Sequence, residues 1–116
     1  MEIATSILNV KEAESIKTFY RLEIAHIDYF HIDIMDGNFV KNNTIELMER
    51  YADSLKNITN IPLDIHLMVK DIKKYVDEFA SCMPRNITFH IEATENKEEA
   101  IQLIKYIKEQ DWKVGI

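Results

Sequence analysis

Two short stretches of the chain carry side chains that commonly bind metal ions. His31 and Asp33 lie in residues 29–35 (YFHIDIM), and His66 lies in residues 63–68 (LDIHLM). In both stretches aliphatic residues alternate with polar ones, so that in a β-strand the polar side chains share one face. If the two strands are neighbours, two imidazoles and one carboxylate converge and can form the protein part of a divalent metal site.

The polar face of each stretch continues to a methionine. Met35 lies beyond Asp33 and Met68 lies beyond His66, each at the next position on the same face. We expect both thioethers to form an apolar, polarisable lining beside the metal. Two histidines and one aspartate suit Zn, Fe, Mn or Co equally, so the sequence predicts one divalent metal ion without identifying it. A single strand histidine is usually structural, but the repeated pattern favours the metal site.

The two stretches belong to a regular alternation of apolar strands and amphipathic helices. We expect strands near residues 3–8, 27–35, 61–68, 86–91 and 112–116, and helices near residues 9–24, 45–57, 72–81 and 94–109, with Asn9, Thr44 and Asp71 as N-caps. Such alternation predicts parallel strands joined by right-handed crossovers. The repeat length suits a (β/α)8 barrel, which needs roughly 200 residues or more. We therefore expect an α/β fold, the N-terminal half of a TIM barrel, with about four βα units and the start of a fifth strand. Residues 1–116 would form one incomplete domain.

Composition limits the partners and the compartment. The net charge is −6 and no basic patch stands out, which argues against a nucleic-acid partner. No apolar run approaches the ~20 residues of a membrane span, and the N-terminus lacks the pattern of a secretion signal. Cys82 is the only cysteine, so the chain has no internal disulfide. We therefore expect a cytoplasmic protein that binds neither nucleic acid nor membrane.

Longer strings around these residues resemble a known enzyme family. Residues 31–40 (HIDIMDGNFV) and 63–68 (LDIHLM) closely resemble the signature stretches of ribulose-phosphate 3-epimerases and of the related allulose-6-phosphate 3-epimerases. Residues 6–8 (SIL) and 90–92 (HIE) are also similar, and the resemblance runs in order along all 116 residues. Thr5 and Lys41 are departures, because the family usually has proline at both positions.

The resemblance implies an isomerase of carbohydrate metabolism. Its members invert C3 of a ketose phosphate, here ribulose 5-phosphate to xylulose 5-phosphate, by two-base proton transfer through an enediolate. His31, Asp33 and His66 would be metal ligands, and Asp33 would also be a catalytic acid/base. Substrate contacts would come from Ser6, His66, Met35, Met68 and Glu92.

The resemblance leaves several alternatives open. In the family, a second aspartate on the seventh strand completes the metal site and the acid/base pair, and glycine-rich loops bind the phosphate. Since these 116 residues lack both features, we expect the chain alone to be nearly inactive. The alternatives are part of a longer epimerase, of the ribulose- or allulose-phosphate type, and a non-catalytic metal-binding half-barrel. An unclosed half-barrel would expose two sheet edges and its aliphatic outer face, so we expect a homo-oligomer or other self-association.

Overall fold

Five parallel strands form one sheet in which the order in space follows the order in sequence. The structure, a computed structural model, describes all of residues 1–116. The strands are β1 (Ala4–Ser6), β2 (Tyr29–Met35), β3 (Leu63–Met68), β4 (Asn86–Phe89) and β5 (Lys113–Gly115), and they pair in the order β1-β2-β3-β4-β5. In a doubly wound sheet the order in which successive strands are added reverses partway, whereas in a barrel each strand is added on the same side of the one before it. The predicted α/β fold, a partial TIM barrel, is confirmed.

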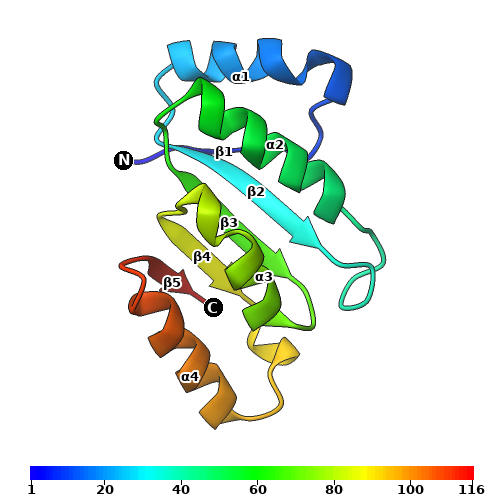
Figure 1. Cartoon of the computed structure of the whole chain (residues 1–116), viewed down its shortest axis with the longest axis vertical. Helices are drawn as coiled ribbons and strands as arrows, with labels where there is room; N and C mark the ends of the chain where they lie inside the picture. Colours follow the sequence, from blue (N-terminus) through cyan, green and yellow to red (C-terminus); the bar gives the residue numbers. More distant parts are fainter.

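Four helices alternate with the strands and cover one face of the sheet (Figure 1). They are α1 (Ser15–Ile24), α2 (Ile45–Ile58), α3 (Ile72–Glu78) and α4 (Lys97–Lys108), with short 3-10 turns η1 (Glu12–Glu14), η2 (Ala80–Cys82) and η3 (Ile91–Ala93). Right-handed crossovers along a sheet wound in one direction place every helix on the same side. The opposite face of the sheet is therefore left without a helical layer.

The helices cover the aliphatic face of the strands. Ile32 and Ile34 of β2 and Ile65 of β3 are fully buried in the core, which also includes Met48 and Leu55 of α2. The expectation that an unclosed half-barrel exposes its aliphatic face is therefore wrong, because the helices of this half already bury it. The parts of the sheet that no helix covers are its polar face and its two edges, at β1 and β5.

The start of α1 and the capping of α2 differ from the sequence predictions. Helix α1 begins at Ser15 and not near Asn9, because Val10 is held in a loop: its carbonyl accepts a hydrogen bond from the Tyr51 hydroxyl at 2.6 Å. Thr44 precedes α2 as predicted, but its side chain makes no capping bond to the helix. Asp71 does cap α3, since its carboxylate accepts a bond from the Lys74 amide.

The chain after β4 also differs from expectation. β4 ends at Phe89, and the next residues turn through η3 before Asn96 caps α4 by accepting a bond from the Glu99 amide at 2.8 Å. Glu92, an expected substrate contact, therefore lies in a 3-10 turn beyond the end of β4. None of the helices is long and apolar enough to span a membrane.

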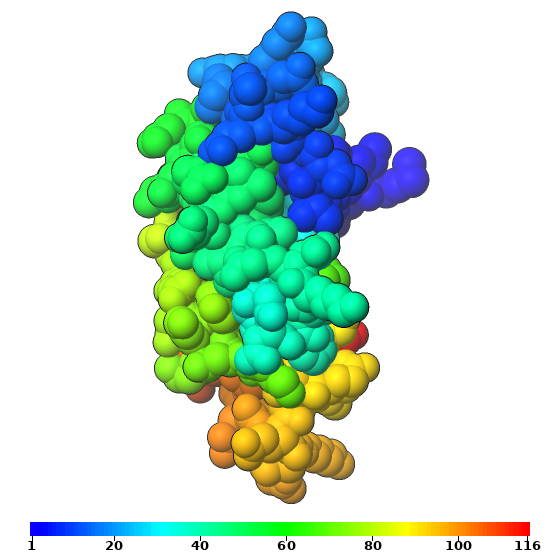
Figure 2. Space-filling view, turned by 90° about the vertical axis from the view of Figure 1, so that its right-hand side faces the viewer, coloured from blue at the N-terminus to red at the C-terminus, as the bar shows by residue number.

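The loop after β2 is fixed by Asp36. Its Oδ1 accepts bonds from the Asn38 and Phe39 amides, and its Oδ2 accepts one from the Lys70 amide, each at 2.8 Å. Gly37 takes a left-handed φ of 75°, which glycine adopts without strain. The three hydrogen bonds to Asp36 hold the backbone of Asn38, Phe39 and Lys70 in place. In Figure 2 this loop, in cyan to teal, lies beside the yellow segment that follows β4.

Candidate metal centre

The register of β2 and β3 creates the polar cluster. Asp33 lies directly opposite His66, His31 lies opposite Asp64, and Met35 lies opposite Met68. Because side chains alternate along a strand, all of these project from the face that the helices leave uncovered. The predicted convergence of the two stretches thus follows from the pairing of neighbouring parallel strands.

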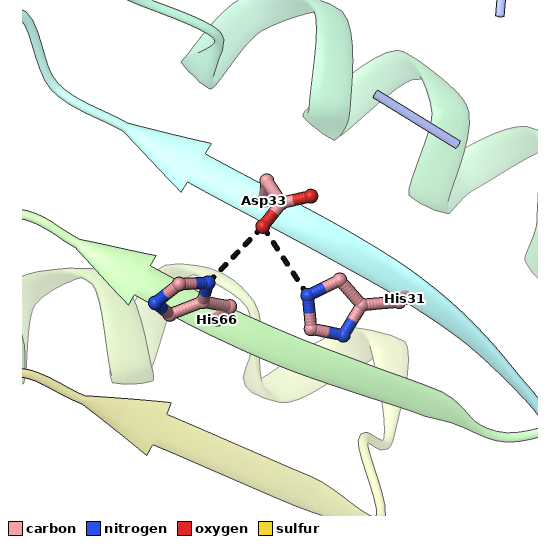
Figure 3. A group of neighbouring side chains, drawn as sticks. All are labelled: His31, Asp33 and His66. Atoms are coloured by element: carbon pink, nitrogen blue, oxygen red, sulfur yellow. Dashed lines mark hydrogen bonds and ion pairs between the residues drawn. The ribbon is translucent and has the colours of Figure 1, made fainter. Parts of the chain in front are cut away.

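Both imidazoles point at one oxygen of Asp33 (Figure 3). Asp33 Oδ1 lies 3.2 Å from His31 Nε2 and 3.1 Å from His66 Nδ1. The second oxygen, Oδ2, accepts a hydrogen bond from the Ser6 hydroxyl at 3.1 Å. The Asp33 side chain is only 12% exposed, whereas the two imidazole side chains are each 26% exposed. The carboxylate is therefore held at the base of the cluster and the histidines border it.

The three side chains fit a divalent metal ion. One ligand atom from each of His31, Asp33 and His66 lies within 4.8 Å of the others. Donors that share one metal at about 2.1 Å are separated by roughly 3–3.5 Å, close to the two nitrogen–oxygen distances seen here. Two imidazole nitrogens and a carboxylate oxygen also form a donor set common to Zn, Fe, Mn and Co sites.

Asp64 supports His31 from the side opposite Asp33. Its Oδ2 lies 2.9 Å from His31 Nδ1, so Nε2 is the nitrogen left to face the cluster. Histidines that bind metals usually donate their other N–H to a carboxylate or carbonyl in this way. The Asp64 carboxylate raises the pKa of His31 above its usual value, burial opposes that increase, and the charge of Asp33 adds to it. The sequence pattern placed Asp64 on this face but gave it no role, because the register was unknown.

The residues expected to contact substrate fall into three places. Ser6 is brought to the cluster, where it hydrogen-bonds Asp33. Met35 and Met68 form a partly exposed cross-strand pair. This pair occupies the next position on the same face, closer to the carboxyl ends of the strands than Asp33 and His66. Glu92 lies apart: its side chain is 71% exposed, and its nearest partner is His90, with Oε2 at 3.8 Å from Nδ1.

Two further residues position the cluster through contacts that the sequence did not predict. The Thr44 hydroxyl donates to the Asp33 carbonyl at 2.7 Å and accepts from the Met35 amide at 2.9 Å, which fixes the end of β2. His90 Nε2 lies 2.7 Å from His66 Nε2. Neither contact has a local sequence signal, because both partners come from separate elements.

Fold and site together define a class of protein. A parallel sheet wound in one direction, helices on one face, and a His/Asp cluster on the other face are features of (β/α)-barrel proteins with a metal centre inside the barrel. Residues 2–116 match the model of the Ribulose-phosphate 3 epimerase family. The chain belongs to this family, whose activity is that of an isomerase.

Individual relatives agree with that assignment. The chain is 34% identical to the ribulose-phosphate 3-epimerase of Bacillus subtilis over 116 residues, which are all of this chain and 51% of the relative. It is 39% identical to that of Escherichia coli over 89% of this chain and 45% of the relative. It is 36% identical to that of Methanocaldococcus jannaschii over 92% and 44%, respectively. The chain thus spans about half the length of the curated relatives it matches.

Proposed function

We propose that this chain supplies the metal-binding half of the active site of a ketose-phosphate 3-epimerase, as one incomplete barrel domain over residues 1–116. The substrate would be ribulose 5-phosphate and the product xylulose 5-phosphate, since the similar relatives are named ribulose-phosphate 3-epimerases. The observation that carries the proposal is the buried Asp33 carboxylate, which faces two metal-type imidazoles through one oxygen.

Asp33 is the proposed acid/base. Its carboxylate takes the C3 proton from one face of the sugar and leaves an enediolate, and the Ser6 hydroxyl fixes the orientation of the carboxylate. His31, Asp33 and His66 would hold one divalent ion, either Zn, Fe, Mn or Co. When bound, this ion stabilises negative charge on the substrate oxygens. Met35 and Met68 would line the sugar, with Ser6, His66 and Glu92 as further substrate contacts.

Inversion also requires a proton donor on the opposite face. The cluster contains one carboxylate that faces both imidazoles, and the other nearby carboxylate, Asp64, is engaged with His31. The chain has only Gly37 and Gly115, so it offers no glycine-rich loop to bind a phosphate. We therefore expect the 116-residue chain alone to remove and return the C3 proton on one face, with little or no epimerisation.

The test combines isotope exchange with product formation. The chain, loaded with Mn²⁺ or Co²⁺, is incubated with ribulose 5-phosphate in deuterated water, and NMR follows the C3 hydrogen and the appearance of xylulose 5-phosphate. Metal-dependent exchange that is lost in Asp33→Asn supports the proposal. The control is Asp53→Asn on the exposed side of α2, which should leave exchange unchanged. Equal exchange in wild type and Asp33→Asn would overturn the role of Asp33.

A second candidate is a non-catalytic metal-binding half-barrel. The single acid/base carboxylate and the uncovered polar face favour it. This candidate predicts stoichiometric metal binding with no exchange at C3, and Asp33→Asn would then change only metal affinity. An allulose 6-phosphate substrate is a further alternative, and exchange with that hexulose but not with ribulose 5-phosphate would favour it.

A further inference from the structure

His90 forms a second layer behind the metal ligand His66. The two Nε2 atoms are 2.7 Å apart, and the rings meet edge to edge, with centroids 5.0 Å apart and planes inclined by 29°. The His90 ring also packs against Phe39, with centroids 5.5 Å apart. His90 Nδ1 faces Glu92 Oε2 at 3.8 Å, beyond hydrogen-bond distance. The imidazole of His90 is therefore held at Nε2 by His66 and along its ring by Phe39.

The short contact between two ring nitrogens leaves two arrangements of their protons, and a metal ion on His66 selects one of them. In a neutral imidazole one nitrogen donates and the other accepts, so a bond between two such rings needs one N–H and one lone pair. His66 faces Asp33 through Nδ1, and a metal ion there would require the Nδ1 lone pair. The proton of His66 must then lie on Nε2, where it is donated to His90 Nε2. The proton of His90 consequently lies on Nδ1, toward Glu92.

We propose that His90 is a positioning residue that holds His66 in the ring orientation and tautomer needed for metal binding through Nδ1. This inference rests on the proposed metal centre. The two metal histidines are thereby supported differently. His31 presents Nε2 because the Asp64 carboxylate occupies its Nδ1, whereas His66 presents Nδ1 because His90 occupies its Nε2.

The loop after β2 contributes to the same arrangement. The backbone amide of Phe39 donates a hydrogen bond to the Asp36 carboxylate at 2.8 Å, and the Phe39 ring packs against His90. The side chain of Glu92 is far more exposed than that of His90, at 71% against 38%. Because solvent screens an exposed carboxylate, Glu92 biases the tautomer of His90 weakly, and Glu92→Gln should have a small effect.

The direct test reads the tautomers in the Zn²⁺-loaded chain, because without a metal the Asp33 carboxylate can only accept and requires a proton on His66 Nδ1. Long-range ¹H–¹⁵N NMR spectra distinguish a protonated Nδ1 from a protonated Nε2, and Zn²⁺ is diamagnetic. With Zn²⁺ bound we expect His66 to carry its proton on Nε2 and His90 on Nδ1. A Zn²⁺-loaded wild-type spectrum with the proton of His66 on Nδ1 would overturn the proposal, and this measurement needs no variant.

Variants then link the contact to metal affinity. His90→Leu removes the acceptor, so we expect Zn²⁺ binding weakened by about 10- to 100-fold, the usual effect of losing such a partner. His90→Gln keeps an amide oxygen that can accept the bond and should recover most of the affinity. His26→Asn is the control, because His26 lies in a turn with a φ of 58° that asparagine tolerates.

The outcomes separate this inference from the proposed function. A folded His90→Leu chain that keeps the wild-type Zn²⁺ affinity would overturn the role of His90. If that variant fails to fold, the Zn²⁺-loaded wild-type spectrum and His90→Gln decide. A folded wild-type chain that binds no Zn²⁺ would overturn the metal centre. The metal-free spectrum then tests the His66–His90 contact by itself, because that contact and Asp33 together require the proton of His66 on Nδ1 and that of His90 on Nε2.

Discussion

Asp64 and His31 lie directly opposite each other on β3 and β2, and Asp64 Oδ2 is 2.9 Å from His31 Nδ1. A carboxylate that hydrogen-bonds a metal-binding histidine on the side away from the metal is a recurring arrangement. It fixes the tautomer and the orientation of that histidine. The contact also gives His31 a property that can be measured without a metal ion, because a nearby carboxylate stabilises the protonated ring.

Neutralising Asp64 should therefore lower the pKa of His31. In the wild type the Asp64 carboxylate raises this pKa against the effect of burial. Asp64→Asn keeps the size of the side chain but removes its charge, so the NMR titration of the His31 ring should shift to lower pH. Asp53→Asn, on the exposed side of α2, should leave the titration unchanged. An unchanged His31 titration in folded Asp64→Asn would contradict the contact.

The hydroxyl of Thr44 should contribute to stability although it caps no helix. It bonds both the Asp33 carbonyl and the Met35 amide. Thr44→Val keeps the shape of the side chain but leaves both backbone groups without this partner, and each such loss costs about 1–3 kcal/mol. Urea denaturation should show a lower free energy of unfolding by at least about 1 kcal/mol.

A matched variant separates this effect from a general cost of valine. Thr18 lies within α1, and Thr18→Val removes a hydroxyl that is not bonded to a strand. That substitution should change the free energy of unfolding by about 0.5 kcal/mol or less. Equal losses in Thr44→Val and Thr18→Val would show that the Thr44 hydroxyl does not hold the end of β2.

Asp36 should make stability depend on pH in the acid range. Burial alone would raise the pKa of Asp36, but hydrogen bonds from the amides of Lys70, Asn38 and Phe39 outweigh it and hold the pKa below its usual value. A carboxyl with a lowered pKa in the folded state stabilises the fold above the unfolded-state pKa, and the contribution disappears as pH falls through the folded-state pKa.

Asp36→Asn should accordingly be less stable than the wild type near neutral pH, by about 1 kcal/mol, since the amide retains only part of the acceptor capacity. The difference should remain constant down to about pH 4 and then shrink as the wild-type carboxylate becomes protonated. Denaturation curves measured across this range check the prediction. A difference that grows toward acid pH would have the wrong sign.

The free sheet edges should lead to self-association. β1 and β5 each have a strand neighbour on one side only, and unpaired strand edges are ready to pair with another chain. The association should arise from these edges and from the uncovered polar face, since the aliphatic face is buried under the helices. Sedimentation velocity should show species larger than a monomer as the concentration rises. A monomer at every concentration would contradict this prediction.

The sequence was most informative where a pattern acts locally. Alternation within β2 and β3 correctly separated the aliphatic face from the face that bears His31, Asp33 and His66. The parallel direction of the strands followed from the rules for crossovers, and their sequential order followed from the barrel that the repeat length predicted. These features depend on residues that are neighbours along one element, and each stretch could be interpreted by itself.

Features that depend on contacts between elements could not be predicted. The start of α1 moves to Ser15 because Tyr51, in another helix, binds the Val10 carbonyl. Thr44 is positioned to cap a helix, yet its hydroxyl bonds β2, because that strand end lies within reach. The role of Asp64 required the register of β2 and β3, which sets its distance from His31.

The most direct test of the central claim is a Co²⁺ titration of the 116-residue chain, followed by calorimetry and by the visible absorption of the bound ion. The account predicts one Co²⁺ per chain, with binding unchanged in the control His26→Asn and lost or greatly weakened in Asp33→Asn and in His66→Leu. It would be contradicted by the absence of stoichiometric Co²⁺ binding in the folded wild type. Binding in folded Asp33→Asn and His66→Leu that equals the wild type would also contradict it.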